Sequence, residues 1–241
     1  WLQTGNTVLV ITSGIQYNIS YKILTGGICM GSYLNPGNFS FRGSLRSKIY
    51  VDKSELIAKT NEALCTEQRY ICVSRPRRFG KSMAANMLAA YYDRSENTEE
   101  LFRNLAISKD SSYKENLNQY DVIKINMQEF LSMSGTMEEM LDMLKKYLVL
   151  DFEEAYPQVR FRDEKNLIQV LKDVFSYTRC PFVILIDEWD CLFREYQQDQ
   201  EAQKKYLDFL RAWLKDKDYV ALAYMTEIGR ASCRERVYHC V

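Results

Sequence analysis

The chain has 241 residues, of which 46% are hydrophobic and 27% charged, and its 32 basic residues balance 32 acidic ones. This length suits one large domain or two small ones, and the composition excludes an intrinsically disordered chain. The zero net charge argues against a global electrostatic attraction to nucleic acid, while a local basic patch stays open.

The N-terminal stretch, residues 1–29, differs in composition from the rest of the chain. It is almost free of charge and shows no clear hydrophobic period. We predict that the natural protein begins at Met30 and that this stretch is not part of the domain. The alternative is a genuine N-terminal extension.

From Met30 onward, helical and extended patterns alternate. Hydrophobic residues at helical spacing predict helices over residues 54–65, 81–92, 137–156, 164–177 and 199–215. Short apolar or alternating runs predict strands over residues 69–73, 121–127, 182–186 and 219–225. The continuous apolar run at 182–186 is typical of a parallel strand that is buried on both faces. This order of elements predicts a doubly wound α/β fold with a mainly parallel sheet and flanking helices.

The C-terminal stretch, residues 227–241, follows the apolar run that ends at Thr226. It contains two cysteines, three arginines and the single histidine of the chain, His239. We interpret it as a non-native tail of the kind that translated vector sequence produces, so the domain is expected to span residues 30–226.

Residue types that are scarce in the chain exclude several chemistries. One histidine near the C-terminus argues against Ser-His-Asp triads and H-E-x-x-H zinc sites. Seven cysteines without a C-x-x-C pair indicate reduced thiols and a cytoplasmic location. No apolar run approaches the roughly 20 residues of a membrane-spanning helix.

Residues 74–83, SRPRRFGKSM, come close to a phosphate-binding loop, whose pattern is G-x-x-x-x-G-K-[ST]. Gly80, Lys81 and Ser82 are in register, but Arg75 stands where the first glycine is expected. In such a loop the lysine reaches the β- and γ-phosphates, and the serine hydroxyl binds Mg²⁺. The alternative is a solvated basic run ahead of a helix.

An acidic pair, Asp187 and Glu188, directly follows the apolar strand at 182–186. An aspartate at such a strand end holds Mg²⁺ in phosphate-loop ATPases, and a glutamate one residue later can polarise the attacking water. The alternative is an acidic N-terminus of the following helix, without a chemical role. Finding loop and acidic strand in this order favours nucleotide binding.

The strand at 219–225 is predicted to lie between the loop strand and the acidic strand in the sheet. Thr226 at its tip would then lie near the γ-phosphate, or it is an ordinary threonine at a strand end.

Tyr50 and Asp52 either approach the adenine or pack against the first helix, with packing favoured. Trp189 is expected in the core.

Four segments carry a resemblance to a known family: KIYVDKSELI, ICVSRPRRFGKSMAANMLAAYY, VIKINMQEF and VILIDEWDCLFREY. Together they resemble the AAA-ATPase-like domain family of bacterial and archaeal proteins, from about Met30 to Thr226. This family has Arg-Pro-Arg-Arg-Phe where other loops are rich in glycine, which implies that Arg75 is no defect.

The resemblance implies a phosphate-loop NTPase fold with ATP and Mg²⁺ as cofactors. Catalytic roles are implied for Lys81 and Glu188, with Thr226 added from its place in the sheet, and Ser82 and Asp187 would hold the metal. The cofactor-binding residues would be Arg75, Pro76, Arg77, Arg78, Phe79, Gly80, Lys81 and Ser82.

Members of this family commonly continue into a PD-(D/E)xK-type nuclease-like domain, which implies that the longer protein meets nucleic acid. Glu227 stands where the family usually has glycine, so we expect a C-terminally truncated copy with an incomplete sheet. The loop strand would then lie at an exposed apolar edge, and residues 30–226 alone would express poorly or aggregate.

Three functions stay open at this level. The first is a Mg²⁺-dependent ATPase, or an ATP-binding switch, that moves an attached effector domain. The second is a nucleic-acid or partner-binding module in which Arg75, Arg77 and Arg78 contact phosphates. The third is a regulator that binds ATP without hydrolysing it.

Overall fold

The fold is described from a computed structural model, which describes residues 3–4, 7–12, 15–19 and 31–228. Near the N-terminus, β1 (Gln3–Thr4), β2 (Thr7–Thr12) and β3 (Ile15–Ile19) form an antiparallel sheet. The strands of the main sheet are β4 (Tyr70–Arg75), β5 (Asp121–Asn126), β6 (Phe182–Asp187) and β7 (Val220–Ile228). The helices are α1 (Phe39–Leu45), α2 (Glu55–Ala63), α3 (Lys81–Tyr92), α4 (Glu99–Phe102), η1 (Ala106–Lys109), α5 (Tyr113–Asn116), α6 (Met127–Met133), α7 (Met137–Ala155), α8 (Leu167–Thr178), α9 (Cys191–Glu195) and α10 (Gln200–Leu214).

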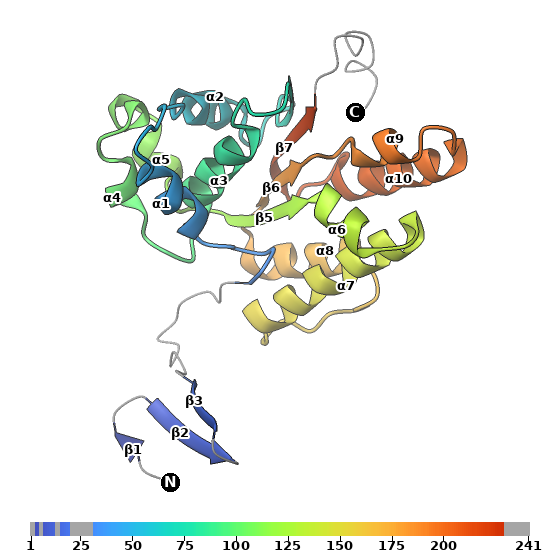
Figure 1. The fold of residues 1–241 in the computed structure, drawn as a ribbon, viewed down its shortest axis with the longest axis horizontal. Coiled ribbons are helices and arrows are strands. Elements are labelled where there is room, and N and C mark those ends of the chain that lie inside the picture. Colours follow the sequence, from blue (N-terminus) through green and yellow to red (C-terminus); the bar gives the residue numbers. More distant parts are fainter. Residues whose placement is uncertain (1–2, 5–6, 13–14, 20–30, 229–241) are drawn as a thin grey trace.

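The main sheet has four strands in the order β4-β7-β6-β5, and every neighbouring pair is parallel (Figure 1). This arrangement confirms the predicted sheet, including the placement of β7 between the loop strand β4 and the acidic strand β6. Because parallel strands end at the same edge, the loop after β4 and the acidic pair at the end of β6 lie at one edge of the sheet.

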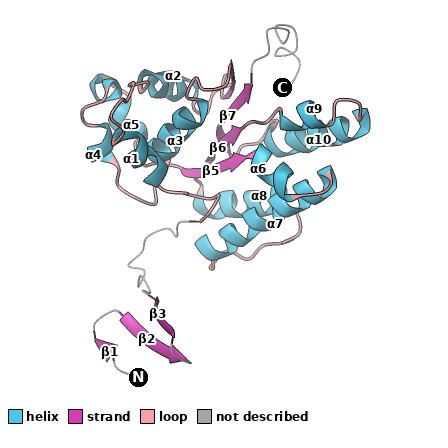
Figure 2. Ribbon diagram, in the orientation of Figure 1, coloured by secondary structure: helices cyan, strands magenta, loops and turns pink. Residues whose placement is uncertain are grey.

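Helices cover both faces of this sheet, which makes three layers (Figure 2). Residues 182–186 are continuously apolar because every residue of β6 is buried. Val183 and Leu185 pack with residues of α1, α2, α3 and α4, whereas Ile184 and Ile186 pack with residues of α6 to α10. The predicted doubly wound architecture is therefore confirmed.

Helix α3, predicted over residues 81–92, is buried on nearly all sides. Nearly every residue from Ala84 to Tyr92 is buried, while Met83 is only partly buried. A helix that is hydrophobic all round belongs in the interior. Here α3 lies between the sheet and α1, so it loses its solvent-facing side.

The short helices escaped prediction because a hydrophobic period needs about three turns to show. These elements, α1, α4, η1, α5, α6 and α9, have four to seven residues each. Ser54, the first residue of the helix predicted over residues 54–65, directly precedes α2, and its hydroxyl does not cap that helix. It accepts a hydrogen bond of 3.1 Å from the backbone N–H of Ile107 in η1.

The two edges of the main sheet are treated differently. Residues 33–35 run along β5, with an antiparallel bridge between Leu34 and Ile123, and so cover that edge. At the other edge, β4 pairs with β7 alone among the described strands, and Tyr70 to Val73 are only partly buried.

Strand β7 continues to Ile228, two residues past the expected end of the domain, while residues 229–241 lie outside the described part. Most of residues 1–29, which we predict not to be part of the domain, also lie outside the described part, apart from β1 to β3. Within the described ranges, no helix has both the length and the apolar character needed to cross a membrane.

Candidate functional site

The loop between β4 and α3 makes its turn without a glycine at position 75. Arg75 is the last residue of β4, pairs with Ile228 of β7, and has no positive φ. The left-handed backbone positions are Arg78, at φ +69°, and Gly80, at φ +76°. The turn that a first glycine usually makes is therefore displaced into the middle of the loop, which explains why Arg75 is tolerated.

Two lysines hold the carbonyl groups of this loop. The Lys81 ammonium folds back and donates to the carbonyl oxygens of Arg75, at 2.8 Å, and Pro76, at 3.0 Å. From outside the loop, Lys53 donates to the carbonyl oxygen of Phe79 at 2.7 Å. Sequence analysis missed Lys53, although it lies in the YVDKSELI segment that was singled out.

Tyr50 and Asp52 of that segment contact α1, η1 and the residue before α2. The ring of Tyr50 lies 6.4 Å from the ring of Phe41. The carboxylate of Asp52 accepts from the backbone N–H groups of Ser54 and Ala106, each at 2.8 Å. These contacts anchor the segment beside the loop, which lets Lys53 reach Phe79.

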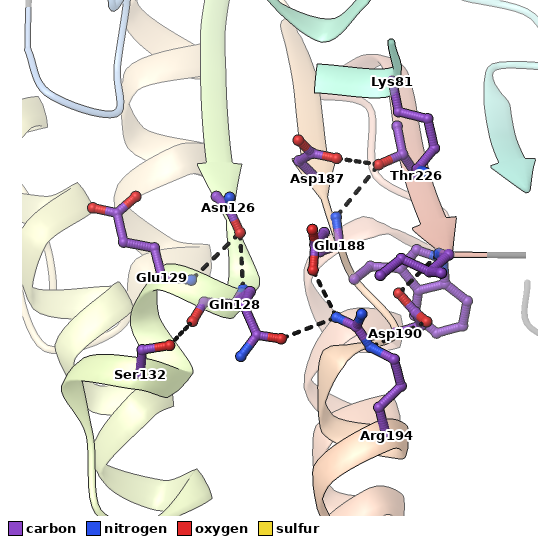
Figure 3. A network of polar contacts seen from close by, with 12 residues as sticks. Lys81, Asn126, Gln128, Glu129, Ser132, Asp187, Glu188, Asp190, Arg194 and Thr226 are labelled. Atoms are coloured by element: carbon purple, nitrogen blue, oxygen red, sulfur yellow. Dashed lines mark hydrogen bonds and ion pairs between the residues drawn. The ribbon is translucent and has the colours of Figure 1, made fainter. Parts of the chain in front are cut away.

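Asp187 at the end of β6 joins two other predicted site residues. Its Oδ2 accepts a hydrogen bond of 2.5 Å from the Ser82 hydroxyl, and its Oδ1 accepts one from the Thr226 hydroxyl. Asp187 is 6% exposed and Thr226 is fully buried. The structure thus brings the start of α3 and the tips of β6 and β7 together, as Figure 3 shows for Asp187 and Thr226.

Glu188 leaves the strand in the left-handed region, at φ +53°, a backbone state that is uncommon for a residue other than glycine. Its backbone N–H donates to the Thr226 hydroxyl at 3.4 Å. Its side chain forms an ion pair with Arg194 of α9, at 2.7 Å (Figure 3). Neither Asp187 nor Glu188 caps α9, which is preceded by Asp190, so the role of a simple acidic helix start does not describe them.

Uncompensated positive charge surrounds the loop. Arg75, Arg77 and Arg78 are exposed, and within the described ranges no carboxylate forms an ion pair with them. Lys124 of β5 adds a half-buried ammonium near the acidic strand. Burial lowers the pKa of Lys124, while the carboxylates of Asp187 and Glu129 partly oppose that shift. Sequence analysis missed Lys124, because only strand pairing brings it to the site.

The oxygen atoms of Ser82 and Asp187 suit a magnesium ion, which needs few protein ligands, better than a metal that is held by protein side chains alone. Among the described residues, no three His, Cys, Asp or Glu side chains gather as a metal cluster. Mg²⁺ characteristically takes one or two protein oxygens and completes its shell with waters and phosphate oxygens. A hydroxyl and a carboxylate already 2.5 Å apart meet that requirement.

In this parallel sheet, β4 leads through a basic loop into a buried helix, and an aspartate ends β6, which lies one strand beyond β7. This arrangement defines the class of P-loop NTPase-like folds. Comparison with protein families matches residues 41–228 to the AAA-ATPase-like family, described as predicted AAA-ATPases. The chain belongs to this family. A search of curated proteins finds no match.

Proposed function

We propose that this chain binds ATP together with Mg²⁺ and hydrolyses it to move an attached effector domain. The observation that supports this most directly is the hydrogen bond of 2.5 Å between Ser82 and Asp187. The two groups that would share the metal are brought together from α3 and β6, and the loop between β4 and α3 lies directly beside them.

Phosphate binding would use groups that are now turned onto the loop itself. The Lys81 ammonium would exchange the carbonyl oxygens of Arg75 and Pro76 for β- and γ-phosphate oxygens. The backbone N–H groups at the start of α3 favour an anion at the same place. Arg77 and Arg78 are exposed and can supply further positive charge.

The proposed reaction is an in-line attack of water on the γ-phosphorus. A bond forms between the water oxygen and phosphorus, the bond from phosphorus to the ADP oxygen breaks, and Glu188 takes the proton from the water. Thr226 would hold Asp187 and Glu188 in position, since its hydroxyl contacts both the Asp187 carboxylate and the Glu188 backbone. Bound Mg²⁺ would neutralise charge on the phosphate oxygens.

The test is MgATP binding by the purified chain and by Lys81→Ala, measured calorimetrically. We expect Lys81→Ala to lose binding, because the ammonium that neutralises the phosphates is removed. Lys145→Ala is the control, since Lys145 lies on α7, on the other face of the sheet, and pairs with Asp142. Equal MgATP affinity in Lys81→Ala and the parent would refute the proposal.

The same samples separate the competing functions. A module that uses Arg75, Arg77 and Arg78 for nucleic acid predicts binding that falls steeply with salt and ignores ATP. A non-hydrolysing regulator predicts MgATP binding without phosphate release. The resemblance implies that a nuclease-like domain is the effector in a longer protein, so nucleic acid would be that domain's substrate.

A further inference from the structure

The side chain of the candidate general base, Glu188, is held in an ion pair. Its Oε2 accepts a hydrogen bond of 2.7 Å from the Arg194 guanidinium. The Arg194 side chain is only 11% exposed and the Glu188 side chain 28% exposed, so water screens this ion pair less than a surface pair. By contrast, Asp187 next to it accepts hydrogen bonds from the neutral hydroxyls of Ser82 and Thr226.

Arg194 also links two helices across Glu188. The same guanidinium donates to the side-chain oxygen of Gln128 on α6, at 3.0 Å, and lies 3.5 Å from the Asp190 carboxylate (Figure 3). Helix α6 follows β5, which is the strand beyond β6 from the loop, and it packs against α9. A change in the position of α6 relative to α9 would therefore alter the contacts of Arg194, which holds the Glu188 side chain.

Such a contact works against catalysis through the position of the Glu188 side chain. The charge-assisted bond holds the side chain on the side of α9, whereas attack on the γ-phosphorus requires the carboxylate to reach the water. Turnover therefore requires this ion pair to open.

We propose that Arg194 is a positioning residue that restrains Glu188, and that movement of α6 against α9, transmitted through Gln128, releases it for turnover. This inference rests on the proposed function, because Glu188 must be the base. It adds that ATP hydrolysis is governed by contacts on α6, on the side of the sheet opposite α3.

The experiment compares steady-state ATP hydrolysis and MgATP affinity in the full chain and its Arg194→Gln variant. We expect kcat to rise about fivefold with unchanged MgATP affinity, since the restraint is removed and the phosphate loop is not. The gain should vanish in Glu188→Gln/Arg194→Gln, and Arg194→Lys should restore a rate near that of the parent. Gln128→Ala should give a smaller rise. Arg162→Gln is the control, because it breaks an arginine–carboxylate pair, with Asp173, away from the site.

An unchanged or reduced kcat in Arg194→Gln, with unchanged MgATP affinity and unfolding temperature, would overturn the inference. Should Arg194→Gln fail to fold, Gln128→Ala decides, and a rate equal to that of the parent overturns it. Failure of the parent itself to bind MgATP is a different result, because it refutes the proposed function.

Discussion

Ser82 and Asp187 are 105 residues apart in the chain, yet the Ser82 hydroxyl donates to the Asp187 carboxylate at 2.5 Å. One belongs to the first turn of α3 and the other ends β6, with β7 between their strands. The contact exists because three parallel strands end at one edge. It places the Asp187 carboxylate beside Ser82, which directly follows Lys81 at the start of α3.

Removing the Ser82 hydroxyl tests whether this residue helps to bind Mg²⁺. For Ser82→Ala we expect the gain in ATP affinity on adding Mg²⁺ to fall about tenfold, equivalent to about 1.4 kcal/mol. ATP binding in the presence of a chelator should stay the same, since Lys81 is untouched. Titration calorimetry with and without Mg²⁺ measures both. Ser44→Ala on α1, whose hydroxyl makes only an exposed hydrogen bond to the Ser40 carbonyl oxygen, is the matched control, and an equal Mg²⁺ effect in both variants would contradict the metal role.

Replacing the candidate base separates binding from chemistry. Glu188→Gln keeps the size of the side chain but cannot accept the proton, so we expect kcat to fall about 100-fold or more. MgATP affinity should stay near that of the parent. Phosphate release and nucleotide binding measured on one preparation give both values. Glu153→Gln, exposed on α7, controls for loss of one negative charge, and hydrolysis by Glu188→Gln at the parental rate would rule out this role.

A buried ion pair at the opposite end of β5 governs stability. Asp121 is fully buried, and the Arg94 guanidinium donates to it through Nε at 3.0 Å and Nη2 at 2.6 Å. Tyr156 and Asn35 donate to the same carboxylate, at 2.6 and 2.9 Å. We expect Arg94→Met to lower the free energy of unfolding by about 3–5 kcal/mol, because it leaves a buried charge without its partner.

Urea unfolding at neutral pH measures this loss. Adding Asp121→Asn to Arg94→Met should recover part of it, since the unpaired charge is removed. Arg103→Met is the control, because Arg103 forms an exposed pair with Glu100 that is worth at most about 1 kcal/mol. The interpretation is wrong if both single variants lose the same stability.

A second acidic residue, Asp173, contributes to the stability of the fold in a way that depends on pH. Burial of Asp173 disfavours its charge, but hydrogen bonds from the side chain and backbone of Arg162 and from Gln169 outweigh this and lower its pKa. A lowered pKa in the folded state adds stability above the ordinary aspartate pKa of about 3.9, and that stability is lost as pH falls through the folded-state pKa.

Asp173→Asn should therefore be less stable than the parent at pH 7, and the difference should shrink as the pH falls below about 4. Thermal unfolding across pH 3–7 follows this difference. Asp142→Asn, which removes an exposed carboxylate paired with Lys145, should show little change at any pH. A gap between Asp173→Asn and the parent that is independent of pH would contradict the assignment.

The sequence by itself determined most of the regular fold, because periodicity and chain order are local properties. The predicted strands and long helices agree with the structure to within a few residues, and the order of loop strand, acidic strand and last strand allowed β7 to be placed between β4 and β6. Lys81, Ser82, Asp187 and Thr226 could be selected as candidate site residues because their motifs lie at or shortly after strand ends.

Tertiary structure alone decided which groups touch. Lys53 reaches the Phe79 carbonyl from 26 residues away, and Lys124 approaches Asp187 only through the pairing of β5 with β6. The pairing of Glu188 with Arg194 depends on the left-handed backbone at Glu188 and on the short helix α9, neither of which has a periodic signal. Side-chain contacts of this kind depend on strand register and helix packing, which the whole chain sets together.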